Sequence, residues 1–155
     1  MRFIVQDYKA KPVETSPNIA FGYADTPEKI YEFFKQVVET DPGYEPEKEH
    51  VIVITLSTRL RATGWHLVSM GSVSETTCHP REILRPVIVR CAFSFVLCHN
   101  HPSGDASPSQ ADERVTRRLR ESAELLQINM ADHVIVGTPA PGRSPYYSFR
   151  EAGIL

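Results

Sequence analysis

The spacing of apolar residues along the chain predicts three helices. After Thr26, which can cap a helix, apolar residues recur on one helical face, and this helix should end near Thr40. A second helix is expected from Pro80 to about Ala92, with Pro86 falling early in it or kinking it. The third should begin at a serine cap and bury one face, formed by Val115, Leu119, Ala123 and Leu126.

Between these helices, continuous apolar runs rich in β-branched residues predict buried strands. They are expected at 51–56, 93–98 and 131–137. Residues 59–63 are typical of a hairpin turn ended by Gly64, with a returning strand at 65–70. Shorter strands are expected at 3–8 and 146–149. Because strands and helices alternate while a hairpin intrudes, the sequence predicts an α/β (α+β) fold, a mixed sheet sandwiched by helices.

The composition supports one compact domain. A chain of 155 residues that is 41% hydrophobic can bury a real core once, but hardly twice. We expect an N-terminal extension at 1–25 and a single domain at 26–155. No apolar run approaches the roughly 20 residues that a membrane helix needs. Three cysteines without a Cys-x-x-Cys pair, Cys78, Cys91 and Cys98, are expected to be reduced core thiols, which favours a cytoplasmic protein.

The charge balance offers no general attraction to nucleic acid. With a net charge of −2, the chain lacks the excess of positive charge that draws a protein to phosphate backbones or anionic membranes. Four arginines could touch a phosphate or an acidic tail, but acidic residues lie between them, as on a solvated helix face. These are Arg114, Arg117, Arg118 and Arg120. We assign them no function, and the oligomeric state stays open.

The candidate chemistry follows the second buried strand. Residues two apart in an extended segment share a face, so His99 and His101 can aim at one point while Asn100 faces away. Pro102 keeps His101 extended. Asp112 would lie in the first turn of the third helix, able to face the histidines. Two neutral imidazoles and a carboxylate form a three-ligand set that leaves one zinc position open for water.

Each part of this motif also has a simpler explanation. Ser109-x-x-Asp112 fits a helix cap, in which the serine accepts from the N3 amide. A His-x-His pair at a strand end can bond to loop backbone. The conjunction of both elements across one short loop favours a metal site.

The other histidines carry weaker signals. His133 could contact the site, although a core or rim position is the simpler interpretation, and His79 could approach it. Solvent or packing roles are expected for His50 and His66.

The motif resembles the JAMM motif of the MPN+ (JAB) metallopeptidases, and within them the RadC-like branch. The resemblance to the JAMM motif rests on His99-x-His101-Pro102, six residues, then Ser109-x-x-Asp112. The resemblance to the RadC-like branch rests on the stretch His99-Asn100-His101-Pro102-Ser103-Gly104-Asp105 followed by Pro108-Ser109. It extends downstream through residues 132–137 and 147–153 and covers roughly residues 27 to 155. It implies a cytidine deaminase-like fold, with a curved mixed sheet between helices.

The resemblance also implies a function. It implies a zinc hydrolase that cuts a peptide or isopeptide bond, with a protein tail among the candidate substrates. The implied ligands are His99, His101 and Asp112. Glu49 would act as general acid/base on a zinc-activated water, and Ser109 would donate to the oxyanion.

The choice of Glu49 comes from the resemblance alone. Glu45 and Glu47 share its strand parity, and a charge flanking an apolar strand can simply be solvated. Glu49 stands seven residues before Leu56, where the family pattern has its glutamate. Two departures from that pattern, Ser57 for the usual Asp and Val51 for the usual aromatic, touch no metal or acid/base position.

Two other function classes stay open. One is a DNA-repair or recombination accessory of the RadC type, disfavoured by the charge and by the lack of the helix-hairpin-helix segment of longer family members. The other is a non-catalytic MPN scaffold, disfavoured by the complete ligand set. The sequence does not select a substrate.

Overall fold

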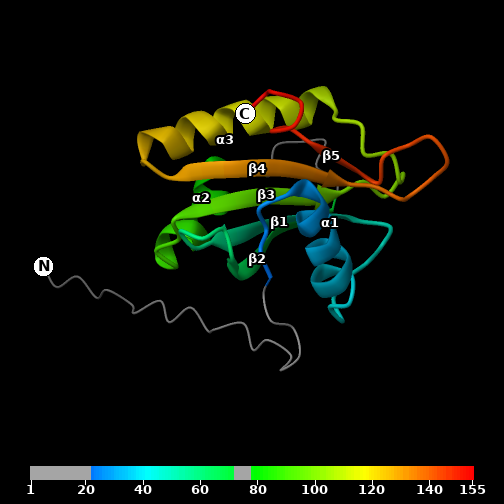
Figure 1. The fold of residues 1–155 in the computed structure, drawn as a ribbon, viewed down its shortest axis with the longest axis horizontal. Helices are drawn as coiled ribbons and strands as arrows, with labels where there is room; N and C mark the ends of the chain where they lie inside the picture. The colour runs from blue at the N-terminus through cyan, green and yellow to red at the C-terminus, as the bar shows by residue number, and fades with distance from the viewer. Residues whose placement is uncertain (1–21, 72–77) are drawn as a thin grey trace, which may run out of the picture.

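The structure, a computed structural model, describes residues 22–71 and 78–155 and forms a single five-stranded mixed sheet flanked by helices (Figure 1). The strand order is β2-β1-β3-β4-β5; β3 and β4 are parallel and the other pairs are antiparallel. The strands are β1 (Glu49–Leu56), β2 (Ala62–Gly71), β3 (Ser94–Asn100), β4 (Asn129–Val136) and β5 (Tyr146–Ser148). The helical segments are α1 (Pro27–Phe33), its π-helical continuation η1 (Phe34–Val38), α2 (Pro80–Val89) and α3 (Gln110–Leu125). The predicted mixed sheet between helices is confirmed.

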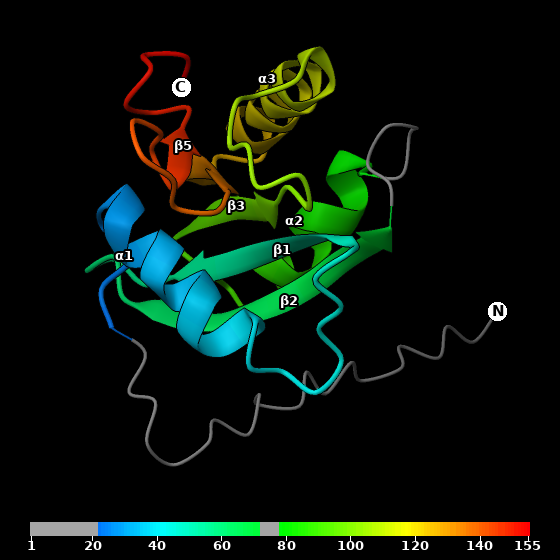
Figure 2. The same cartoon turned by 90° about the vertical axis from the view of Figure 1, so that its right-hand side faces the viewer.

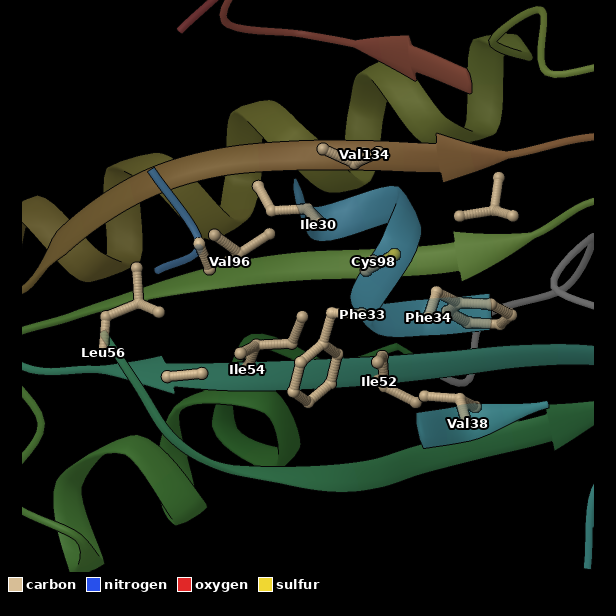
Figure 3. Packing of buried hydrophobic residues seen from close by; sticks show 13 residues of the cluster. Ile30, Phe33, Phe34, Val38, Ile52, Ile54, Leu56, Val96, Cys98 and Val134 are labelled. Carbon is tan, nitrogen blue, oxygen red and sulfur yellow. The ribbon is translucent and has the colours of Figure 1, made fainter. Parts of the chain in front are cut away.

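One face of the sheet is covered by α1 and η1. The Thr26 side chain caps α1 by accepting from the Lys29 N–H, and Pro27 occupies the first turn, where its missing N–H costs nothing. Figure 3 shows the apolar cluster beneath this helix, in which Ile30 and Phe34 are fully buried. The helix ends at Val38, two residues earlier than expected.

The opposite face is covered by α2 and α3 (Figure 2). Alternate residues of the central strands divide between the two faces, as strand geometry requires. Toward α2 and α3 point Val51, Val53, Phe95 and Leu97; toward α1 point Ile52, Ile54, Val96 and Cys98. Burial on both faces explains the uninterrupted apolar runs of β1 and β3.

The hairpin between β1 and β2 differs from the expectation at Gly64. The turn lies between Leu56 and Ala62, and Gly64 is a buried residue inside β2. A Cβ on Gly64 would lie 2.6 Å from the Arg90 guanidinium, which donates to the carbonyl of Thr63. Gly64 therefore makes room for an arginine of the neighbouring helical segment and does not mark the end of the turn, which is complete before Ala62.

The ends of two helices also differ from those predicted by the spacing of apolar residues. The second helix ends at Val89, and Cys91, two residues later, has a left-handed backbone with φ of 49°. Its side chain is exposed, so the expectation of a core thiol was wrong for Cys91. In α3, Leu126 follows the last helical residue and is 49% exposed, whereas Ile128 packs against the core instead. The expectation for Leu126 was wrong because the chain leaves the helix before reaching it.

The expected strand at 3–8 and most of the extension at 1–25 lie outside the described residues. Of the remainder, Ala24 is buried and its N–H donates to the carbonyl of Leu60. Neither described stretch of the chain, 22–71 or 78–155, contains a helix with the length and apolar character needed to span a bilayer.

Packing of α3 predicts contrasting effects of two leucine truncations on the same helix. Leu119 is 0% exposed and Leu125 is 85% exposed. Leu119→Ala should lower the free energy of unfolding by about 2–5 kcal/mol, because it leaves a cavity in the core. Leu125→Ala should change it by less than about 0.5 kcal/mol. Urea denaturation monitored by circular dichroism measures both, and equal effects would contradict the assignment of the buried face.

Candidate metal centre

The candidate site forms where three elements meet at one end of the sheet. Glu49 begins β1, His99 lies near the end of β3, and Asp112 lies in the first turn of α3. This is the right-hand end of the sheet in Figure 1, which faces the viewer in Figure 2. Because β1 and β3 are antiparallel, the start of one strand meets the end of the other, and the register pairs Val51 with His99. Residues some fifty positions apart are thereby brought together.

Four side chains converge there. His99 Nε2 lies 3.2 Å from His101 Nε2, 3.3 Å from Glu49 Oε1 and 3.2 Å from Asp112 Oδ1. Asp112 Oδ2 lies 3.6 Å from His101 Nε2. One potential ligand atom from each of the four residues fits within 4.8 Å of the others. The sequence expectation that both histidines share a face while Asn100 points away agrees with this geometry.

The hydrogen bond of His101 fixes which of its ring nitrogens carries the proton. His101 Nδ1 lies 2.7 Å from the carbonyl oxygen of Asp105, which can only accept. In the neutral ring Nδ1 therefore carries the hydrogen, and Nε2 presents a lone pair toward His99. Burial lowers the pKa of His101, but the neighbouring Asp112 carboxylate and the Asp105 carbonyl, both of which favour the protonated ring, outweigh burial, so its pKa is raised.

A chain of buried hydrogen-bonding groups places the ring hydrogen of neutral His99 on Nδ1 as well. The Thr116 hydroxyl donates to the backbone carbonyl of Asp112 at 2.6 Å, so its oxygen accepts from His133 Nδ1, also at 2.6 Å. Burial and the nearby His99 hold the pKa of His133 well below its usual value, which keeps the ring neutral. His133 Nε2 then accepts from His99 Nδ1 at 3.0 Å. His99 Nε2 is left with its lone pair facing the site.

His133 is itself held firmly in place. Its ring stacks on Phe149 with a centroid distance of 4.6 Å and an interplanar angle of 6°. The neighbouring Asp132 carboxylate is buried and accepts from the backbone N–H groups of His133 and Arg150 and from the Ser148 hydroxyl. The final segment of the chain thus supports the histidine that orients His99.

Asp112 serves the helix and the site at once. Its Oδ2 accepts from the backbone N–H of Ser109 at 2.7 Å and from the Ser109 hydroxyl at 2.6 Å, and Ser109 Oγ accepts from the Asp112 N–H. This completes a capping box at the start of α3. Burial alone would raise the pKa of the Asp112 carboxyl, but the adjacent His101 and His99 rings and the hydrogen bonds from Ser109 hold it well below its usual range. Its Oδ1 points at His99.

The chemistry of these groups fits a bound cation. Two imidazole lone pairs and two carboxylates face one another at 3.2–3.6 Å, and none of these atoms donates in the neutral-imidazole state assigned above. Such acceptors repel unless a positive charge lies between them. Two imidazoles with carboxylate oxygen are a donor set that zinc prefers. The residues present therefore suit the metal site that the family resemblance implies.

Other residues considered from the sequence lie elsewhere. Glu45 and Glu47 are exposed, and Glu45 pairs with Lys48, so Glu49 alone of the three lies against His99. His66 and His79 are exposed. The four arginines of α3 also lie on its exposed side.

Sequence reasoning did not single out Thr116. Its position one helical turn after Asp112 places its hydroxyl against the Asp112 carbonyl. That spacing carries no signal without knowledge of where His133 lies.

Comparison with known proteins gives the family. The RadC-like JAB domain matches residues 24–154, and the chain belongs to this family. It is 42% identical over 123 residues to a UPF0758 protein of Chlorobaculum parvum, covering 78% of this chain and 53% of that protein. Similar proteins occur in Chlorobium chlorochromatii (40% identity; 72% of this chain, 48% of that protein) and Thermotoga maritima (37% identity; 84% and 54%). The chain spans about half the length of these curated relatives.

The geometry predicts that removing one ligand removes the metal. The wild-type protein should bind about one Zn²⁺ per chain, and His99→Ala or Asp112→Ala should lose it. His66→Ala, which changes an exposed histidine away from the site, is the matched control and should keep full zinc content. Metal analysis after dialysis measures these four proteins and a His99→Ala, Asp112→Ala double variant. Full zinc content in the double variant would contradict the site.

The buried chain through His133 predicts an effect on affinity without loss of a ligand. His133→Ala removes the acceptor that keeps the hydrogen of His99 on Nδ1, so zinc affinity should fall by about 10- to 100-fold. Competition with a chromophoric chelator measures the dissociation constant, and the folded state is checked by circular dichroism. An unchanged constant in the folded variant would show that His133 does not orient His99.

Proposed function

We propose that this domain is a zinc-dependent hydrolase that cleaves an amide bond in a peptide or isopeptide substrate. The observation that carries this proposal is the position of the Glu49 carboxylate, 3.3 Å from His99 Nε2 beside a second imidazole and Asp112. A purely structural zinc site usually takes four protein ligands and leaves no group free for proton transfer. Here the fourth group is a carboxylate on a different strand, suited to acid/base work.

The donor set supports His99, His101 and Asp112 as zinc ligands. Zinc bound there would polarise the substrate carbonyl and lower the pKa of a coordinated water, which is the chemistry the metal supplies. All other steps fall to side chains of the chain itself. The side chain of Glu49 is only 14% exposed, so its carboxylate works in surroundings with limited access for bulk water.

Glu49 is suited to moving the proton. Its carboxylate would accept a proton from the attacking water and return it to the leaving nitrogen as the carbon–nitrogen bond breaks. The amide and one water thus become a carboxylic acid and an amine, which end as a carboxylate and an ammonium ion after the acid passes its proton to the amine. This cycle restores the Glu49 carboxylate, so one residue serves as base and then as acid.

Ser109 is suited to stabilising the oxyanion, but only after a rearrangement. Its hydroxyl donates to Asp112 Oδ2 at 2.6 Å. To donate to a substrate oxygen, the hydroxyl must turn away from that carboxylate. The Ser109 N–H, which donates to the same oxygen at 2.7 Å, would continue to hold Asp112 in place. We propose that the hydroxyl alternates between the cap and the oxyanion.

A glutamine substitution separates metal binding from catalysis. Glu49→Gln keeps the size of the side chain but removes the proton acceptor, so kcat should fall by at least about 100-fold while zinc content stays near one per chain. Glu47→Gln is the matched control, since Glu47 is exposed and lies two residues earlier with the same parity. Zinc-loaded proteins are assayed on panels of peptides and isopeptide-linked peptides. Equal turnover by Glu49→Gln and wild type would place the base elsewhere.

A further inference from the structure

We infer that Asn100, assisted by the ring of His50, is a positioning residue for Glu49. This inference rests on the proposed function and names a further residue in it. Asn100 lies between the two histidines of the candidate site, yet its side chain points to the other face of the sheet. There it bonds to the backbone on both sides of Glu49.

Two hydrogen bonds make this contact, which we call the Asn100 anchor. The His50 N–H donates to Asn100 Oδ1 at 2.8 Å, and Asn100 Nδ2 donates to the carbonyl oxygen of Lys48 at 3.1 Å. Asn100 is 5% exposed and His50 is 2% exposed. These groups are therefore shielded from water that could replace the bonds, and breaking one leaves a buried polar group unsatisfied.

The imidazole of His50 also bonds to the carbonyl oxygen of Lys48. His50 Nδ1 lies 2.9 Å from the Lys48 oxygen, and His50 Nε2 accepts from the Glu45 N–H at 3.3 Å. The ring also packs against Tyr44 with a centroid distance of 4.6 Å. The segment that leads into Glu49 is thus tied down by one buried ring and one buried amide.

The Asn100 anchor lies just beyond the last residue pair between β1 and β3. The β1–β3 pairing ends at Val51 and His99, so no strand register reaches Glu49 from the β3 side. On its other side, Glu49 is paired with Gly71 of β2. Hydrogen bonds from the Asn100 side chain replace the backbone pairing that is absent here. They join the backbone on either side of Glu49 to the segment that bears both histidines.

This arrangement gives Asn100 a different role from that of the two histidines beside it. The two histidines present ring nitrogens on the α3 side of the sheet, while Asn100 on the α1 side sets how far Glu49 lies from them. A displacement of the order of 1 Å at a reacting group costs roughly 100-fold in rate. The anchor therefore acts on proton transfer rather than on metal binding.

The test compares Asn100→Ala with Thr55→Val in the zinc-loaded protein. Thr55 is buried at the far end of β1 and bonds through its hydroxyl to Thr63 and Gly64, so its substitution also costs buried hydrogen bonds but leaves Glu49 untouched. Asn100→Ala should lower kcat by about 10- to 100-fold with little change in KM and with zinc affinity unchanged. Thr55→Val should leave all three unchanged.

A double-variant cycle shows whether Asn100 acts through Glu49. In the Glu49→Gln background, adding Asn100→Ala should cause no further loss of kcat, because the group being positioned is gone. Equal fold losses in both backgrounds, or full kcat in folded Asn100→Ala, would overturn the inference. If Asn100→Ala does not fold, His50→Phe replaces it, since it keeps an aromatic ring against Tyr44 but loses the bond to Lys48. A loss of kcat there supports the anchor and full kcat overturns it.

Amide hydrogen exchange tests whether the Asn100 anchor exists, and it requires no substrate. The His50 N–H should exchange slowly in wild type and in Thr55→Val, and at least about 10-fold faster in Asn100→Ala, because its buried acceptor is lost. An unchanged rate would overturn the anchor even if the protein is an active hydrolase. Absence of any wild-type cleavage would instead overturn the proposed function together with the catalytic consequence of the anchor, while the exchange rates still report whether the anchor exists.

Discussion

Four electron-pair donors face one another at the end of the sheet, and much of the fold serves to keep them there. The lone pairs of His99 Nε2 and His101 Nε2 point toward each other at 3.2 Å, with the Asp112 and Glu49 carboxylates beside them. When both imidazoles are neutral these groups repel one another, and a divalent cation bound between them would turn that repulsion into coordination. The hydrogen bonds behind each ligand matter because they decide which atoms face the centre.

Three of the four donors are each supported by a different part of the chain. The Asp105 carbonyl orients His101, the His133–Thr116 chain orients His99, and the capping box of α3 orients Asp112. Metal ligands are commonly fixed in this way by a hydrogen bond to the group behind them. The acceptor behind His99 is another imidazole rather than a carboxylate, and stacking on Phe149 keeps that imidazole in place.

Local patterns predicted the elements of the fold well and the ends of those elements poorly. Continuous apolar runs located β1, β3 and β4 because these strands are buried on both faces. The errors at Gly64 and Leu126 arose because their surroundings come from distant residues or from the way the helix ends. Neither signal is present in the spacing of nearby residues.

For the candidate site too, local patterns predicted some residues and missed others. The shared face of His99 and His101 and the helical position of Asp112 follow from local geometry. Glu49 could be chosen over Glu45 and Glu47 only from the family resemblance, because the choice depends on the antiparallel register between β1 and β3. Thr116 and the anchoring role of Asn100 required the folded arrangement, since their partners lie 17 to 52 positions away.

X-ray absorption spectroscopy of the zinc-loaded protein reports the atoms bound to the metal. A centre formed by His99, His101 and Asp112 should give a first shell of nitrogen and oxygen only, at about 2.0–2.2 Å, with the outer-shell scattering of two imidazoles. A sulfur shell at about 2.3 Å, or a first shell without imidazole scattering, would contradict this ligand set.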